Sequence, residues 1–179
     1  IAKLGQLASC RPDLVGPIRA RIEGELGRAV DAVFADFDDT PLAAASLAQV
    51  HAATLLDGTR VAIKVQVPGT EPVTEADIGA LRTVANTLGD VPGVDLATLT
   101  DELSRALQTE LDYVAEAESL VAFGRHGSAV VTPRPIAHAS SKRVLTMTRI
   151  DGERLTACLD RLAPADRDRV LAELVGEVA

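Results

Sequence analysis

The feature that most constrains the fold is a pair of strand-like runs joined by Asp57-Gly58. The runs extend from Gln49 to Leu56 and from Thr59 to Val67. Asp-Gly is a strong signal for a two-residue hairpin turn, because both positions tolerate a positive φ. Along the second run, side chains alternate between the two faces of the strand: Val61, Ile63, Val65 and Val67 on one, Ala62, Lys64 and Gln66 on the other. The sequence therefore predicts an antiparallel hairpin that presents Lys64 on one face.

Helical periodicity surrounds this hairpin on both sides. Residues 1–30 favour helix, with a second piece from Pro17 to Leu26 that ends at Gly27. The other predicted elements are helices over Val73–Leu88 and Leu96–Phe123, short strands over Val130–Ile136 and Arg143–Ile150, and a helix from Ala165 onward. Helices and antiparallel strands that are segregated in this way indicate an α+β fold.

Composition narrows the functional classes. The 179 residues suit one domain, and the net charge of −8 argues against a nucleic-acid footprint or a polybasic membrane surface. Cys10 and Cys158 match no metal spacing and form no disulfide framework. No apolar run reaches the length of a membrane span. We therefore expect a reducing, cytoplasmic compartment. Because neither end carries a start or stop signal, we also expect a longer parent protein, for which membrane association stays open.

Lys64 is the residue with the most specific chemistry. It ends the segment Val61-Ala62-Ile63-Lys64, which matches the V-A-I-K pattern of kinase-like strands. In such folds this lysine grips the α- and β-phosphates of ATP, and a loop that precedes the neighbouring strand covers those phosphates. Here the loop position holds Ala43-Ala44-Ala45-Ser46. Alanine favours helix, so we expect that this loop can continue as helix instead of lying over a nucleotide.

Several motifs occur in the order found in one known family. These are Lys3-Leu4-Gly5-Gln6, the alanine segment Pro41 to His51, Val61 to Gly69, Glu110-Leu111-Asp112-Tyr113 with Glu116-Ala117, and Val144 to Met147 with Ile150-Asp151-Gly152. The chain thereby resembles the UbiB group of atypical, protein-kinase-like proteins. It departs from that family between Leu14 and Ile22, where the connecting stretch is shorter.

The resemblance implies a protein-kinase-like N-lobe, namely a twisted antiparallel sheet with flanking helices and an extra N-terminal helix. It divides the chain into a helical extension (1–30), the N-lobe (31–150), and a hinge with the start of a truncated C-lobe (151–179). It also implies binding of ATP, with Mg²⁺ in the full-length parent, and a link to ubiquinone biosynthesis and lipid metabolism, so that lipid or quinone-pathway proteins are candidate partners. The implied nucleotide-site residues are Lys64, Ala43, Ala44, Ala45, Ser46, Ala62, Met147 and Ile150.

Lys64 needs a carboxylate partner, and the long predicted helix offers Glu110, Asp112 and Glu116. Residues two positions apart in an α-helix are separated by about 200° around the helix axis. Glu110 and Asp112 should therefore point to different sides. Asp112 and Glu116 should share a face. Lys64 and Lys3 are the candidate cations, and spacing alone does not choose between the carboxylates. By resemblance, the helix of Lys3 and Gln6 packs over the site and regulates access to it.

The catalytic residues of a kinase are absent from the sequence. No H-x-D pattern follows Lys64, and Asn86, the only asparagine, lies in a predicted helix. We therefore expect no phosphoryl transfer by this chain alone and predict no catalytic or metal-binding residue in it. Two alternatives remain open, which are the ATP-binding part of a kinase-like enzyme and a non-catalytic nucleotide-binding or interaction module.

Overall fold

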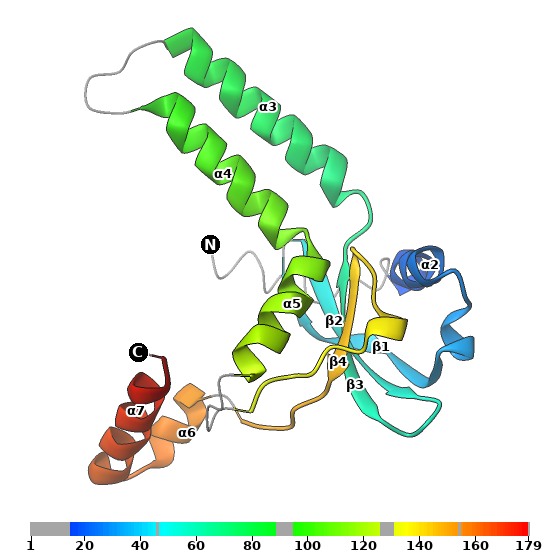
Figure 1. The fold of residues 1–179 in the computed structure, drawn as a ribbon, viewed down its shortest axis with the longest axis vertical. Helices are drawn as coiled ribbons and strands as arrows, with labels where there is room; N and C mark the ends of the chain where they lie inside the picture. Colours follow the sequence, from blue (N-terminus) through cyan, green and yellow to red (C-terminus); the bar gives the residue numbers. More distant parts are fainter. Residues whose placement is uncertain (1–14, 46, 89–94, 126–130, 154, 179) are drawn as a thin grey trace.

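The structure, a computed structural model, describes residues 15–45, 47–88, 95–125, 131–153 and 155–178. Its centre is a four-stranded antiparallel sheet with strand order β1-β2-β3-β4 (Figure 1). The strands are β1 (Phe34–Ala44), β2 (Ala48–Leu55), β3 (Arg60–Gln66) and β4 (Val144–Thr148). Strand β4 returns from much later in the chain to pair with β3, so Lys64 lies between Val50 and Leu145 near the middle of the sheet.

The β2–β3 hairpin confirms the predicted pairing but corrects its turn. Gly58 N donates to the carbonyl of Leu55 at 2.9 Å, and Leu55 N donates to that of Thr59 at 2.9 Å. The loop therefore has three residues, of which only Gly58 has a positive φ, at 86°. This is the turn followed by a glycine bulge that is common in three-residue hairpins. Thr59 N also donates to Asp57 Oδ1 at 2.8 Å, which explains why aspartate suits this position without a left-handed backbone.

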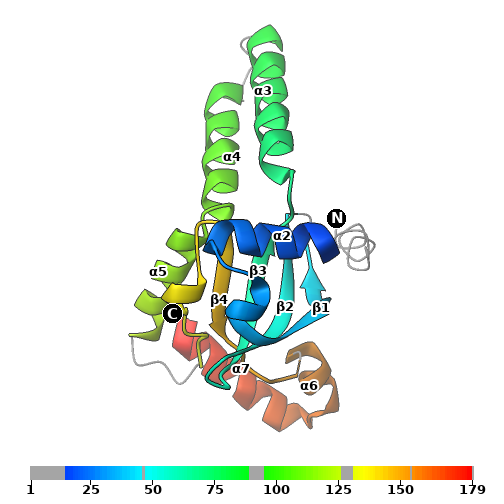
Figure 2. The ribbon, with the colours of Figure 1, turned by 90° about the vertical axis from the view of Figure 1, so that its right-hand side faces the viewer.

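One face of the sheet packs against helix α2 (Val15–Leu26) and the short 3₁₀ turn η3 (Val30–Ala32). Figure 2 shows α2 lying across this face. Ile18 and Ile22, one helical turn apart, are fully buried here. The core on this side is apolar and includes Val30, Val33, Phe34, Phe37, Ala53, Leu55, Val61, Ile63, Val65 and Val144. The predicted alternation along β3 is therefore confirmed, because the side chains of Val61, Ile63 and Val65 are all buried in this core.

The opposite face of the sheet is covered at one end by helix α5 (Tyr113–Gly124). A second cluster forms there from Ala48, Tyr113 and Leu145, with Ala117, Leu120 and Met147 packed against it. Lys64 and Gln66 lie on this side of β3. As a result, the strand carries buried residues on both of its faces, and Gln66 is only 1% exposed.

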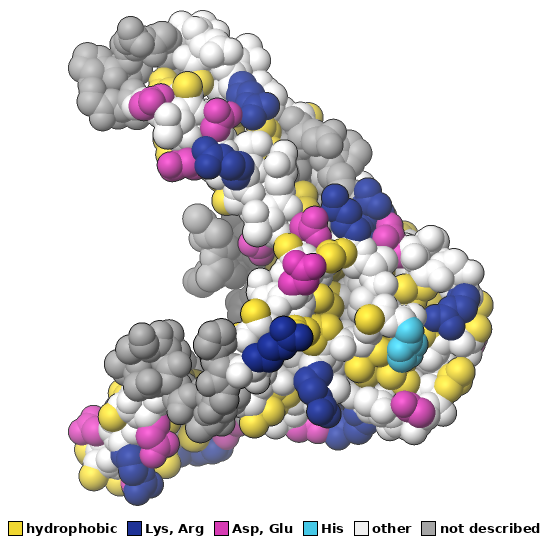
Figure 3. Space-filling view, viewed as in Figure 1, with side chains coloured by type: hydrophobic (Ala, Val, Ile, Leu, Met, Phe, Trp, Pro, Cys, Tyr) yellow, Lys and Arg dark blue, Asp and Glu magenta, His cyan; other side chains and the backbone are white. Residues whose placement is uncertain are grey.

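Helices α3 (Thr70–Leu88) and α4 (Leu96–Glu110) form a hairpin that projects away from the sheet (Figures 1 and 2). Helix α4 begins at an aspartate cap, since Asp95 Oδ1 accepts a hydrogen bond from Thr98 N at 2.9 Å. The hairpin surface carries charges of both signs together with apolar side chains (Figure 3). Its large exposed apolar residues are Leu81, Val84, Leu99 and Leu103.

Two sequence predictions need correction, and two elements were missed. The helix predicted over Leu96–Phe123 is two helices, because Asp112 takes an extended conformation and caps the second one. The strand predicted over Val130–Ile136 is reduced, among its described residues, to a bridge between Pro135 and Met147, since Pro133 and Pro135 lack the N–H groups of a ladder. Strand β1 and helix α6 (Leu155–Arg161) were not predicted. Helix α7 (Pro164–Val178) matches the final predicted helix.

A buried polar group interrupts the core beside β1. His51 is 1% exposed, and its Nδ1–H donates to the carbonyl of Asp38 at 3.0 Å. Its Nε2 lies 3.2 Å from the side-chain amide of Gln49, and its ring stacks on Phe37 at 5.1 Å. Burial is the main cause that lowers the pKa of His51, so the folded protein holds this ring neutral.

This lowered pKa predicts an acid-sensitive fold. Because the unfolded chain takes up a proton at a pKa of about 6.5 and the folded chain resists it, the contribution of His51 is fully present above that pH. It is lost as the pH falls below it. Urea unfolding should therefore show a smaller loss of stability between pH 7.5 and pH 5.5 in His51→Asn than in the wild type. His138→Asn, which alters an exposed histidine, is the control and should keep the wild-type loss. An unchanged pH dependence in His51→Asn would contradict this account.

Candidate functional site

Lys64 forms an ion pair with Glu116 at the sheet surface. Its Nζ donates to Glu116 Oε2 at 2.6 Å, and it also lies 4.7 Å from the centre of the Tyr113 ring. The lysine and glutamate side chains are 22% and 35% exposed. A charge-assisted hydrogen bond that is partly shielded from water, with an aromatic face beside it, holds the ammonium group in one place.

The local sequence of α5 explains why Glu116 reaches Lys64. Asp112 Oδ1 accepts hydrogen bonds from Val114 N at 3.0 Å and Ala115 N at 3.3 Å, which begins the helix at Tyr113. Tyr113 N donates to the carbonyl of Lys142 at 3.1 Å, which joins the helix start to the beginning of β4. Glu116 then lies one helical turn beyond the cap and faces the sheet.

Tyr113 is the largest fully buried side chain of the described residues. Burial is the main cause that raises the pKa of its hydroxyl, and the nearby Glu116 and Glu110 carboxylates raise it further. The ring is therefore neutral at any physiological pH. The Tyr113 ring contacts Lys64 and packs within the second core cluster.

Two cavities adjoin Lys64. One, of about 400 Å³, is lined by Ala45, Leu47, Ala48, Lys64, Leu103, Ala106, Leu107, Glu110 and Tyr113. The other, of about 580 Å³, is more open and is lined by Lys64, Ala106, Thr109, Glu110, Ala115, Glu116 and Ser119. Lys64 and Glu110 therefore stand between an apolar recess under the β1–β2 turn and a polar recess beside α5.

The alanine segment forms the β1–β2 turn and is not helical, contrary to the sequence prediction. Ala43 and Ala44 end strand β1, opposite Val50 and Gln49. Ala45 N donates to the carbonyl of Ala48 at 2.8 Å, which closes the turn. Pairing with β2 outweighs the helix propensity of alanine here. Ala45 lines the apolar cavity, whereas Ser46 lies outside the described residues.

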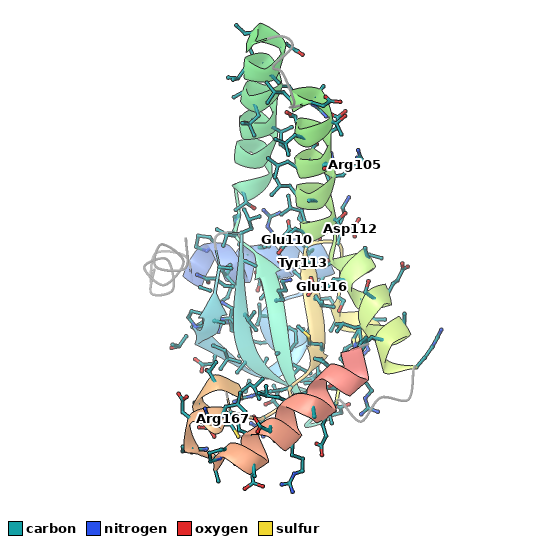
Figure 4. The ribbon with its side chains drawn as sticks, turned by 90° about the vertical axis from the view of Figure 1, so that its left-hand side faces the viewer. Arg105, Glu110, Asp112, Tyr113, Glu116 and Arg167 are labelled. Carbon is teal, nitrogen blue, oxygen red and sulfur yellow. The ribbon has the colours of Figure 1, made fainter. Side chains whose placement is uncertain are left out.

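The three carboxylates that the sequence left as alternatives have different surroundings. Glu116 pairs with Lys64, and Asp112 caps α5 with its Oδ2 3.9 Å from Lys142 Nζ. Glu110 lines both cavities. Figure 4 shows Glu110 and Asp112 on opposite sides of the junction between α4 and α5. Lys3 and Gln6 lie outside the described residues, so their predicted role is not tested here.

The remaining predicted site residues lie on or beside β4. Met147 pairs with Ala62 across the β3–β4 ladder and packs on the second core cluster, while Ile150 is 45% exposed just beyond the strand. Ion pairs that no sequence pattern predicts hold the segment after β4. Asp151 accepts hydrogen bonds from the Arg60 side chain at 2.6 and 3.2 Å. It also forms an ion pair with Arg149 at 3.1 Å. Exposed pairs of this kind add little stability, but they fix where the chain leaves the sheet.

Comparison with known proteins identifies the family. A family model described as "ABC1 atypical kinase-like domain" matches residues 12–178. The chain belongs to this family. It is 37% identical over 139 residues to AarF domain-containing protein kinase 1 of Mus musculus and 32% identical over 178 residues to the probable protein kinase UbiB of Aeromonas hydrophila. These alignments cover 75% and 84% of the chain but only 26% and 33% of those relatives.

A solved structure supports the fold. The structure of Rv3197 from Mycobacterium tuberculosis, in complex with erythromycin, matches with a TM-score of 0.78 and 30% identity. The match covers 92% of this chain and 42% of Rv3197. Together with the family match, it confirms the predicted kinase-like N-lobe. No helix among the described residues has the length and hydropathy needed to cross a membrane.

Asp112 offers a test of how the site is held. Asp112→Ala should lower the free energy of unfolding by about 1 kcal/mol, because the helix cap is lost. Asp112→Asn should cost much less, since asparagine caps helices about as well. Urea unfolding at neutral pH measures both. Equal losses in the two variants would mean that the negative charge, through Lys142, matters and the cap does not.

Proposed function

We propose that this chain is the ATP-binding part of an atypical kinase-like protein. The observation that carries the proposal is the 2.6 Å pair between Glu116 on α5 and Lys64 on β3, the second strand after the alanine turn. In kinases the corresponding lysine–glutamate pair must be in place for the α- and β-phosphates to be held. Membership of the ABC1 family supports the same function.

The residues around the pair suit a nucleotide. Lys64 supplies a positive charge for phosphate oxygens, and Ala45 leaves room for phosphates under the β1–β2 turn. Ala62, Met147 and Ile150 would offer apolar contacts to the base further along β3 and β4. Bound ATP would supply the phosphoryl group, while the residues of this chain would bind and orient it and limit the access of water.

Magnesium would need ligands from elsewhere in the complete protein. Among the described residues, no group of three or more His, Cys, Asp or Glu side chains could hold a metal ion. Glu116 is also engaged by Lys64. We therefore expect Mg²⁺ to reach the site with the nucleotide. The catalytic aspartate and asparagine of a kinase would lie outside this chain. A non-catalytic nucleotide-binding module is the alternative, and the sequence that follows Ala179 in the gene discriminates between the two.

The apolar cavity favours a second candidate function, the binding of a bulky apolar molecule next to the phosphates. Leu47, Leu103 and Leu107 line it beside Lys64. Rv3197 was solved in complex with erythromycin, and the resemblance to UbiB and coq-8 proteins also suggests a quinone-pathway lipid. Leu103→Gln should weaken erythromycin binding and leave ATP affinity unchanged if the two ligands occupy different parts of the site.

Titration of ATP into the complete gene product tests the main proposal. Lys64→Ala should weaken ATP binding about 10- to 100-fold, because a hydrogen bond to a charged group contributes about 1.5–3 kcal/mol. Lys142→Ala is the matched control, since Lys142 is an exposed lysine away from the cavities. Equal ATP affinity of the wild type and Lys64→Ala would contradict the proposal.

The alanine turn offers an independent test. Ala44→Gly and Ala45→Gly should each change the affinity for ATP or its preference over ADP, because glycine lets backbone N–H groups approach phosphates more closely. Ala45 lines the cavity directly, so we expect the larger effect there. Calorimetric titrations of ATP and ADP that match the wild type in both variants would show that this turn does not cover the phosphates.

A further inference from the structure

Gln66 is a buried polar residue that the proposed function does not use. It lies on β3, two residues beyond Lys64 and on the same face of the sheet, and it is 1% exposed. Its Nε2 donates to the carbonyl of Leu111 at 2.5 Å. Its Oε1 is buried, and no group among the residues that the structure describes donates a hydrogen bond to it. A buried acceptor without a partner is unfavourable, so an apolar side chain of similar length would serve stability better here.

The acceptor of this bond occupies a particular position. Leu111 is the C-terminal cap of α4, and the next residue, Asp112, is the N-terminal cap of α5. Leu111 therefore lies at the junction of the two helices. Carbonyls at a helix end lack partners within the helix and need them elsewhere. Gln66 supplies one from β3, while Tyr113 N donates to the carbonyl of Lys142, two residues before β4 begins.

These two bonds fasten the helix junction to neighbouring strands. Backbone pairing also ties the strands together here, since Gln66 N donates to the carbonyl of Arg143 at 3.1 Å. Helix α5 starts immediately after the fastened point, and Glu116 lies in its first turn. The position of the junction therefore sets where the Glu116 carboxylate meets Lys64.

We propose that Gln66 is a positioning residue that holds the α4–α5 junction so that Glu116 pairs with Lys64. Without the Gln66–Leu111 bond, α5 tilts or shifts and the pair opens. The effect on the ion pair stands independently, whereas the effect on nucleotide affinity rests on the proposed function. If Gln66 only filled space in the core, its replacement by methionine would leave the pair intact.

Chemical labelling of Lys64 measures the pair directly. In the complete gene product, an amine-reactive ester should acylate Lys64 slowly, because its ammonium group is paired and only 22% exposed. Glu116→Gln and Gln66→Met should each raise the labelling rate about fivefold to tenfold, the effect of losing one hydrogen bond on a local equilibrium. The double variant should add nothing to either single change, because both act on the same pair. Lys142 in the same sample is the internal reference.

Two controls separate positioning from general loosening. Val61→Ala, on the same strand but in the opposite core, should lower stability without changing the labelling of Lys64. Gln66→Asn keeps an amide but is one methylene too short to reach Leu111, so it should raise the labelling as Gln66→Met does. It serves as the test if the methionine variant does not fold. Wild-type labelling of Lys64 in the folded variants, or additive effects in the double variant, would overturn the proposal.

ATP titrations of the same variants distinguish this proposal from the proposed function. Faster Lys64 labelling in Gln66→Met, with ATP affinity unchanged in both Gln66→Met and Lys64→Ala, would support the positioning role and refute the nucleotide site. Weaker ATP binding in Lys64→Ala, with normal labelling and normal affinity in Gln66→Met, would refute the positioning role alone.

Discussion

The charge-assisted hydrogen bond between Lys64 and Glu116 is the contact around which the site is arranged. It joins a residue of a central strand to a residue more than fifty positions later, on a helix that packs on the sheet face. A long flexible lysine would normally extend into water, where it has the greatest freedom. Here Tyr113 beneath it and Glu116 beside it restrict that freedom, so a positive charge is held at the boundary of two cavities.

Such a site needs a strand that is anchored from both sides. Val61, Ile63 and Val65 are fully buried against the core that α2 covers, which fixes the register of β3. The other face then carries Lys64 among packing residues, which the second cluster around Tyr113 and Leu145 provides. Because adjacent residues of a strand face opposite ways, one short segment serves both the core and the site.

How far the sequence could predict the fold depended on how local each signal was. The β2–β3 pairing, the alternation along β3 and the end of α2 at Gly27 follow from neighbouring residues, and the structure confirms them. Strand β1 was missed because its run contains Asp36, Asp38, Asp39 and Pro41, whose polarity hides a strand with irregular pairing. The loop after Val130 was taken for a strand because its apolar residues outweighed its two prolines.

The site could be predicted in its parts but not in its geometry. Lys64 and the candidate carboxylates follow from the motifs, yet the partner of Lys64 depends on the helix break at Leu111. The break was not apparent because leucines recur every four residues up to it, from Leu99 to Leu111, and no glycine or proline follows there. The bonds of Gln66 to Leu111 and of Asp151 to Arg60 join residues far apart in the sequence, and no pattern within either segment signals them.

The central claim is that the Lys64–Glu116 pair receives the phosphates of a nucleotide. The most direct measurement is a crystal structure of the complete gene product with a non-hydrolysable ATP analogue and Mg²⁺. We expect an α- or β-phosphate oxygen within hydrogen-bond distance of Lys64 Nζ, with Glu116 still paired to the same ammonium group and the β1–β2 turn over the phosphates. A nucleotide bound elsewhere, with Lys64 touching only Glu116, would contradict it.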